Sequence, residues 1–322
     1  MSKAQQVIKI GVSIGLLGAV AYLLDWQQSR ILIGNTPFSD LVLALGLLLG
    51  AYLANGVRLI QLQKRVSLEI PTTLFWGTYY TGLLMNNVLP SGVGGDVVRV
   101  ILLTRRGYPV GALAASGLAD RFLGLFGLLA IAGVAMMIVP AGLPMTESYS
   151  RITGIGLLLG AALGVWWIPR IGIWLLSFAA VRISGQLRAK ISKGSRVFQQ
   201  IFDKPARMAG PGALSLLSHA LLILSYASLG QSLLPGLSLA DYFLAIPGVM
   251  LILVLPISIG GLGVRELSTV GLLIWLGADQ QAALTLSLLF LAITWVSVIP
   301  AIFTAVHYGF GKAEIKEYTD AP

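Results

Sequence analysis

Long apolar runs, separated by short polar segments, dominate the chain. They cover residues 7–25, 38–60, 70–90, 110–139, 151–168, 211–234, 240–256, 264–276 and 281–308. Six of them contain about 18 or more mainly apolar residues, which is enough for a helix to cross a bilayer. The other three, 70–90, 240–256 and 264–276, need another arrangement. The pattern predicts a single all-α polytopic membrane domain over residues 1–322, with 7–8 helices by a simple hydropathy count.

The composition excludes a soluble protein and narrows the chemistry. Hydrophobic residues make up 56% of the chain and charged residues 11%, against about 25% charged residues in soluble domains. There is no cysteine, and His219 and His307 are the only histidines. We therefore expect no metal site and no cofactor. The net charge of +9 fits cytoplasmic loops better than nucleic acid binding.

Basic residues predict the orientation. They gather at the N-terminus, after residue 57, after residue 98, throughout 169–210 and near the C-terminus, whereas the intervening loops hold few. Because cytoplasmic loops are enriched in Lys and Arg, we expect both termini and the basic loop 169–210 to be cytoplasmic. The predicted location is a bacterial-type cytoplasmic (inner) membrane.

The same charge pattern predicts two hairpins that do not cross the bilayer. The loops on either side of 70–90 both look cytoplasmic, and the loops on either side of 240–276 both look external. The simplest solution is a pair of opposed re-entrant hairpins, 70–104 and 240–276, in addition to about six full spans.

An internal repeat supports this arrangement. VLPSGVGGDVVR begins at Val88, VLPISIGGLGVR begins at Val254, and seven of the twelve positions are identical. We expect residues 38–139 to form a first repeat and 211–308 its inverted partner, as in transporters with opposed, interrupted helices. The predicted turn residues are Pro90, Gly94 and Gly95 in the first copy, and Pro256, Gly260, Gly261 and Gly263 in the second.

Each turn predicts a weak anion site. A turn at membrane depth frees backbone N–H groups, which must line a wet cavity or be buried in protein. Together with the helix dipole, these groups favour an anion, and Arg99 and Arg265 lie one turn further on. The alternative is a structural kink with each arginine paired to an acid. Asp96 has the right spacing for Arg99, whereas Glu266 is expected to point elsewhere.

Four further polar residues are candidates for the site. Asp120 and Arg121 interrupt the run 110–139. Arg121 is a candidate for a phosphate site and Asp120 for balancing Arg99 or Arg265; the alternative is a purely structural pair between helices. Asn86 and Asn87 precede the first turn, where we expect them to hydrogen-bond freed backbone groups.

These segments together resemble a known family. The strings NNVLPSGVGGDVVRVILLTRRG from Asn86, ADRFLGL from Ala119 and LPISIGGLGVRE from Leu255 are similar to the lysylphosphatidylglycerol synthase transmembrane-region family, also called flippase-like or UPF0104-type. Asp96 and Asp120 stand where that family usually has Glu, so their reach is shorter. The resemblance implies lipid translocation or lipid handling, with partner enzymes of lipid or glycan synthesis.

The favoured hypothesis is a flippase-like protein that is not an enzyme. It translocates or handles an anionic phospholipid or a polyprenyl-phosphate-linked lipid, with its headgroup bound by Arg99, Arg121 and Arg265. One alternative is an ion-coupled transporter of a small anion, using Asp96, Asp120 or Glu266 as the titrating group. A membrane lipid or glycosyl transferase is disfavoured, because the chain has neither an Asp-x-Asp pair nor a phosphate-binding loop.

Overall fold

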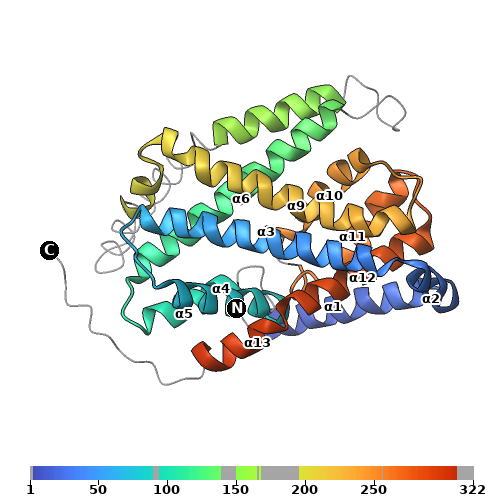
Figure 1. Cartoon of the computed structure of the whole chain (residues 1–322), viewed down its shortest axis with the longest axis horizontal. Helices are drawn as coiled ribbons and strands as arrows, with labels where there is room; N and C mark the ends of the chain where they lie inside the picture. Colours follow the sequence, from blue (N-terminus) through green and yellow to red (C-terminus); the bar gives the residue numbers. More distant parts are fainter. Residues whose placement is uncertain are drawn as a thin grey trace.

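The protein is a bundle of helices (Figure 1). The computed structural model describes residues 3–89, 94–138, 150–164, 167, 196–255 and 257–309. In these residues the chain is all-helical, with no strand. The helices are α1 (Lys3–Leu23), α2 (Trp26–Asn35), α3 (Phe38–Lys64), α4 (Thr72–Val88), α5 (Gly94–Thr104), α6 (Val110–Ile138), Ser150–Gly164, 196–202, η1 (Pro205–Met208), α9 (Ala209–Leu233), α10 (Leu239–Leu253), α11 (Val264–Trp275), α12 (Gln280–Val298), α13 (Pro300–Thr304) and η2 (Ala305–Gly309).

Four of the described helices are long and apolar enough to cross a membrane. They are Phe38–Lys64, Val110–Ile138, Ala206–Leu233 and Gln280–Tyr308, and the bent pair Lys9–Leu23 and Trp26–Asn35 makes a fifth if it is one span. The predicted all-α membrane class is confirmed, and the helix bounds follow the apolar runs closely. The count of six spans stays a prediction, because Ser150–Gly164 has 15 residues and α1 turns by 83° into α2.

Polar caps explain where several helices begin. The carboxylate of Asp25 accepts hydrogen bonds from the backbone N–H groups of Gln27 and Gln28, which starts α2 at the sharp bend. Asp279 caps α12 in the same way. Ser238 and Asp241 form a reciprocal capping box at the start of α10. Such caps satisfy donors that the first turn of a helix leaves free.

Helices α3 and α9 pack antiparallel along the centre of the bundle (Figure 1). The hydroxyl of Ser225 donates to the carbonyl of Ala44 over 2.7 Å, and Gly50 lies against Leu221. Further along α3, Gln61 lies beside Gly210 at the start of α9. Small residues at these positions allow two backbones to approach closely, as is common between membrane helices.

Two helical hairpins lie toward opposite ends of this central pair (Figure 1). In the first, α4 packs against α5, and the backbones of Gly82 and Gly95 are in direct contact. In the second, α10 packs against α11. The tip of the second hairpin reaches the first, because a Cβ atom on Gly260 would stand 2.7 Å from the carbonyl oxygen of Asn87. Gly260 also has a φ of +56°, which favours glycine.

Parts of the sequence prediction lie outside the described residues. These are Pro90, Pro256 and the basic segment up to residue 195. Of the predicted turn glycines, Gly94 and Gly95 begin α5, whereas Gly260, Gly261 and Gly263 all have positive φ and precede α11. The two repeat copies therefore start their second helix at different points of the shared motif.

The largest apolar core is built mainly from the second half of the chain, with Val20, Leu24, Ala44 and Leu48 added from the first. Tyr226 of α9 stacks on Phe290 of α12, with ring centroids 3.5 Å apart, and Leu229, Ile246 and Leu273 are fully buried around them. Many large apolar side chains on the outside of the bundle are exposed. In a membrane protein this outer surface faces lipid rather than water.

We predict that Gly95→Ala destabilises the first hairpin. The new methyl group would overlap the carbonyl oxygen of Gly82 and the amide of Asn86, and overpacking of this kind costs about 1–3 kcal/mol. The matched control is Gly111→Ala in α6, which has nothing within 4 Å. Thermal unfolding in detergent should show a lower Tm for Gly95→Ala and an equal or higher Tm for Gly111→Ala. Equal Tm values for Gly95→Ala and the wild type would contradict the close contact.

Candidate functional site

Charged side chains within the apolar bundle form three groups in the described residues. Asp96 binds both Arg99 and Arg121, Asp120 binds Arg58, and Glu266 binds Arg265. Every carboxylate that was predicted for the site is paired with an arginine. Pairing is expected at membrane depth, because an isolated charge there is costly.

Asp96 connects a buried arginine to an accessible one. Its Oδ2 accepts a hydrogen bond from Nε of Arg121 over 2.7 Å, and its Oδ1 lies 3.3 Å from Nη2 of Arg99. The Arg99 side chain is 6% exposed, whereas those of Asp96 and Arg121 are 29% and 40% exposed. The predicted spacing of Asp96 and Arg99 is confirmed, and Arg121 joins them from α6.

Asp120 and Arg58 form the most regular ion pair. Nε and Nη2 of Arg58 donate to the two oxygens of Asp120, over 2.7 and 3.1 Å. Arg58 comes from α3, and Gly124, one turn beyond Asp120 on α6, leaves room for its guanidinium group. The remaining Nη1 of Arg58 is buried and has no hydrogen-bond partner among the described residues.

This pair corrects two sequence predictions. Asp120 does not balance Arg99 or Arg265, because α3 places Arg58 next to it. Arg58 is also not a loop residue, since α3 continues to Lys64 and its side chain is only 5% exposed. The sequence already indicated that the helix continues past Arg58, because Val57 precedes it and the apolar residues Leu59, Ile60 and Leu62 follow it.

Arg265 and Glu266 form the third group, at the start of α11. Nε of Arg265 lies 3.1 Å from Oε1 of Glu266, whose side chain is fully buried. The other oxygen of Glu266 accepts from the backbone N–H of Gly263 over 2.6 Å. The expectation that Glu266 points elsewhere is wrong, because its cap on Gly263 folds it back toward the helix start. Within the part of the chain that the structure describes, Nη2 of Arg265 is buried without a hydrogen-bond partner.

Both asparagines bind backbone groups, but only Asn86 binds one that the turn frees, as predicted, because Asn87 binds a carbonyl within its own helix. Oδ1 of Asn86 accepts from the N–H of Gly95 over 2.8 Å, and Nδ2 of Asn87 donates to the carbonyl of Leu83 over 3.0 Å. Asn86 and Glu266 thus occupy N–H groups at the starts of α5 and α11. These occupied donors weaken the predicted anion sites at the helix ends and leave anion binding to the arginine side chains.

Two tyrosines connect α3 and α4 inside the bundle. The hydroxyl of Tyr79 donates to the carbonyl of Tyr52 over 3.0 Å. The Tyr79 side chain is buried, so this hydrogen bond ties α4 to α3 in the apolar interior.

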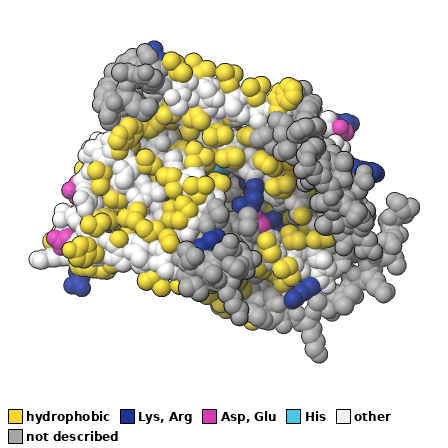
Figure 2. All heavy atoms as spheres, turned by 180° about the vertical axis from the view of Figure 1, so that it is seen from behind, with side chains coloured by type: hydrophobic (Ala, Val, Ile, Leu, Met, Phe, Trp, Pro, Cys, Tyr) yellow, Lys and Arg dark blue, Asp and Glu magenta, His cyan; other side chains and the backbone are white. Residues whose placement is uncertain are grey.

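One face of the molecule is hollowed at its centre, and basic and acidic side chains gather in this recess (Figure 2). Apolar side chains, drawn in yellow, border part of the recess (Figure 2). Among the described residues there is no group of three or more His, Cys, Asp or Glu side chains suited to a metal ion. The arrangement of paired arginines is suited to binding an anion through charge-assisted hydrogen bonds.

We predict that Asp120→Asn destabilises the protein more than the double variant Arg58→Met/Asp120→Asn. Loss of the carboxylate leaves the buried Arg58 cation uncompensated, which costs about 3–5 kcal/mol. Replacing both charges removes that penalty. Thermal unfolding in detergent should rank the wild type first, the double variant second and Asp120→Asn last.

The control for this series is Glu69→Gln, because Glu69 is exposed and its loss should change stability by at most about 0.5 kcal/mol. If Asp120→Asn and Glu69→Gln unfold at the same temperature, the Arg58–Asp120 pair does not stabilise the fold.

Comparison of the sequence with known proteins shows which family the chain belongs to. A search of curated proteins finds no match. A scan against protein families matches residues 6–301 to the family described as Lysylphosphatidylglycerol synthase TM region. The match includes every charged group described above and confirms the resemblance seen in the motifs. The chain therefore belongs to the lysylphosphatidylglycerol synthase transmembrane-region family and is an integral membrane protein.

Proposed function

We propose that this protein is a flippase-like lipid transporter that binds an anionic headgroup at Arg121. The observation that supports the proposal best is the shared carboxylate of Asp96. This carboxylate holds the accessible guanidinium group of Arg121 beside the buried one of Arg99. The chain belongs to a membrane family whose name refers to lysylphosphatidylglycerol, a lipid. The headgroup is that of a phospholipid or of a polyprenyl-phosphate-linked lipid.

Exchange of partners explains how the headgroup binds. A phosphate has the geometry to accept two hydrogen bonds from a guanidinium group, so it can replace Asp96 as the partner of Arg121. Asp96 then still has Arg99 for its negative charge. Binding thus leaves no buried charge unpaired. Arg58 and Arg265 are further phosphate donors deeper in the bundle, because each has one buried nitrogen with no hydrogen-bond partner in the described ranges.

Translocation uses the two repeats as opposed halves. Residues 38–139 and 211–308 form an inverted repeat, and α4–α5 and α10–α11 are re-entrant hairpins that enter from opposite faces. Three features support this: the antiparallel packing of α3 on α9, the hairpins at opposite ends of the bundle (Figure 1) and the contact of Gly260 with Asn87. The headgroup moves past the hairpin tips while the tails stay in lipid.

The cellular setting follows from the basic segments. The membrane is a bacterial-type cytoplasmic membrane, with both termini and residues 169–210 in the cytoplasm. The partners are anionic membrane lipids and the enzymes of lipid or glycan synthesis that supply or use them. The chain itself catalyses no reaction in this proposal.

Arg121→Gln should slow lipid translocation without preventing folding. Loss of a charge-assisted hydrogen bond costs about 1.5–3 kcal/mol, so we expect the rate to fall by a factor of about 10 to 100. The measurement is flipping of a fluorescent phosphatidylglycerol in reconstituted vesicles, followed by chemical quenching of the outer leaflet. Arg121→Lys keeps the charge without the planar donors and should fall between the wild type and Arg121→Gln.

The matched control is Arg30→Gln, because Arg30 is an exposed arginine of α2, away from the charged groups. It should flip lipid at the wild-type rate. If Arg121→Gln, Arg121→Lys and Arg30→Gln all flip lipid at the wild-type rate, headgroup binding at Arg121 is refuted. Uptake of a water-soluble anion driven by a pH gradient, without lipid movement, would instead favour an ion-coupled anion transporter.

A further inference from the structure

The ion pairs inside the bundle leave one positive charge in excess. In the part of the chain that the structure describes, two of the three charged groups are one-to-one pairs of an arginine and a carboxylate. In the third group, Asp96 is shared by Arg99 and Arg121, and we call these three residues the Asp96 cluster. Because an excess charge in an apolar surrounding is costly, the cluster is suited to a ligand with a single negative charge.

The two arginines of the Asp96 cluster lie on the same face of α6. A β-carbon on Gly117 would stand 3.4 Å from Nη2 of Arg99, and Arg121 follows Gly117 by one helical turn. The side chains of Asp96 and Arg121 are both partly exposed, whereas that of Arg99 is buried. A ligand that approaches the cluster therefore meets a guanidinium group and a carboxylate side by side.

A phosphate that binds Arg121 changes what Asp96 needs. Its Oδ1 faces Nη2 of Arg99 over 3.3 Å and keeps that partner. Its Oδ2 accepts from Nε of Arg121 in the structure and loses this hydrogen bond when the phosphate takes the guanidinium group. A carboxylate oxygen that loses its donor in a partly apolar site needs another one. The ligand itself can supply that donor, from the carbons next to the bound phosphate.

Charge decides between the two kinds of donor that a lipid headgroup offers. A hydroxyl satisfies Oδ2 and adds no charge, so phosphate with Arg121 and Asp96 with Arg99 form two neutral pairs. An ammonium group also donates, but it restores the excess positive charge. A lysylated headgroup, to which the description of the family refers, carries more ammonium groups than phosphates and increases the excess. The cluster therefore favours an uncharged, hydroxylated headgroup.

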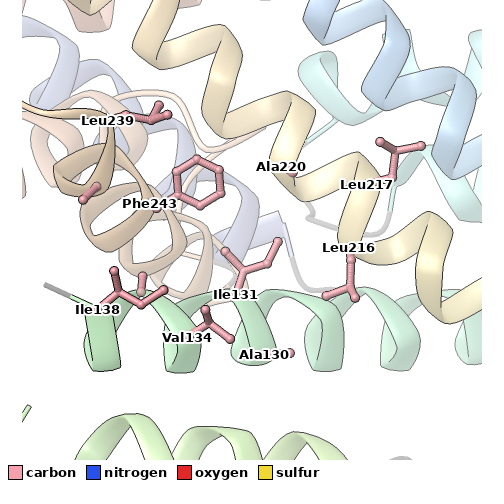
Figure 3. A pocket seen from close by; sticks show the side chains of 11 residues that line it. Ala130, Ile131, Val134, Ile138, Leu216, Leu217, Ala220, Leu239 and Phe243 are labelled. Carbon is pink, nitrogen blue, oxygen red and sulfur yellow. The ribbon is translucent and has the colours of Figure 1, made fainter. Parts of the chain in front are cut away.

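A second hollow of the molecule does not contribute to this selection. An apolar groove opens between α6, α9 and α10, and Ile131, Leu217 and Phe243 point into it (Figure 3). The described residues that line it are all apolar, and none of them belongs to the Asp96 cluster. Recognition of a headgroup is therefore assigned to the cluster rather than to the groove.

We propose that the substrate is a lipid phosphodiester with an uncharged, hydroxylated headgroup, whose phosphate binds Arg121 and whose hydroxyl donates to Asp96. This inference rests on the proposed function, because it needs the phosphate at Arg121. Two kinds of lipid have this chemistry: phosphatidylglycerol, and a polyprenyl phosphate joined to a neutral sugar. Asp96 is then a residue that binds the substrate as well as the counterion of two arginines.

The test compares lipids that differ in the headgroup, in phosphatidylcholine vesicles that contain the full-length protein. Each lipid carries the same fluorescent acyl chain, and chemical quenching of the outer leaflet gives its flipping rate. Phosphatidylpropanol has the carbon chain and the charge of phosphatidylglycerol but no headgroup hydroxyl. We expect phosphatidylglycerol to flip about three- to tenfold faster, which is the factor that one net hydrogen bond contributes. Equal rates would overturn the proposal.

Phosphatidylethanolamine and lysylphosphatidylglycerol test the part of the proposal that concerns charge. Both lipids offer ammonium donors to Asp96, but the first restores the excess positive charge and the second increases it. We expect both to flip more slowly than phosphatidylglycerol. A rate for either lipid that equals or exceeds the rate of phosphatidylglycerol would show that the cluster does not select an uncharged headgroup.

Two fluorescent polyprenyl lipids distinguish the two sources of the substrate. Polyprenyl phosphate joined to glucose has headgroup hydroxyls, whereas polyprenyl phosphate alone has no hydroxylated headgroup. If the glucose-linked lipid flips faster than polyprenyl phosphate and phosphatidylglycerol, the substrate is polyprenyl-linked. If phosphatidylglycerol is the fastest of the three, the substrate is a phospholipid. Fastest flipping of polyprenyl phosphate alone would overturn the proposal.

Asp96→Asn is the decisive variant, and its readout is the ratio of the rates for phosphatidylglycerol and phosphatidylpropanol. A merely structural role of Asp96 would lower both rates and leave the ratio unchanged, whereas loss of the charged acceptor brings the ratio toward one. The matched control is Arg58→Met/Asp120→Asn, which removes the neighbouring ion pair as a unit and should keep the wild-type ratio. An unchanged ratio in folded Asp96→Asn would overturn the proposal. If Asp96→Asn does not fold, the comparison of the two lipids in the wild type still decides.

The outcomes separate this inference from the proposed function. Flipping of phosphatidylglycerol that does not depend on Arg121 would reject the proposed function and this inference together. Flipping that depends on Arg121 but is equally fast for phosphatidylglycerol and phosphatidylpropanol would reject the hydroxyl contact at Asp96 alone and keep the proposed function.

Discussion

The cost of an unpaired charge in an apolar interior constrains the whole structure. In the described part of the chain, four arginines of the bundle are each bound to a carboxylate on the same helix or on a neighbouring one. These pairs fix the packing: Arg58 ties α3 to α6, and Arg121 ties α6 to α5. The same rule applies to the backbone, where Asn86 and Glu266 satisfy N–H groups that the turns would otherwise leave free.

Much of the fold could be predicted because apolar runs mark membrane helices directly. The runs 110–139, 211–234 and 264–276 differ from α6, α9 and α11 by at most two residues at either end. The apolar runs do not indicate where a helix bends, so the 83° turn between α1 and α2 at Asp25 was not predicted. A charge count also assigns every arginine near the end of a run to a loop, and for this reason Arg58 was misplaced.

The pairings of the candidate site residues could be predicted only in part, and Arg58 was not among the candidates. Local spacing was sufficient for Asp96 with Arg99 and for the backbone contacts of Asn86, since these lie on one hairpin. The partners of Asp120 and Arg121 come from α3 and α5, and no local pattern specifies which helices will pack together. Glu266 could not be predicted for a different reason. Adjacent side chains on a helix usually point in different directions, but the hydrogen bond of Glu266 to the N–H of Gly263 turns its carboxylate back toward the start of the helix.

The contact between Gly260 and Asn87 has a mechanical consequence. The carbonyl oxygen of Asn87 lies only 2.7 Å from the place that a β-carbon of residue 260 would take, so the tip of the second hairpin rests on the last turn of α4. Helix α4 cannot advance toward this tip without displacing it. Movements of α4 and of the second hairpin are therefore linked by steric contact. A single added methyl group at residue 260 would act as a wedge between them.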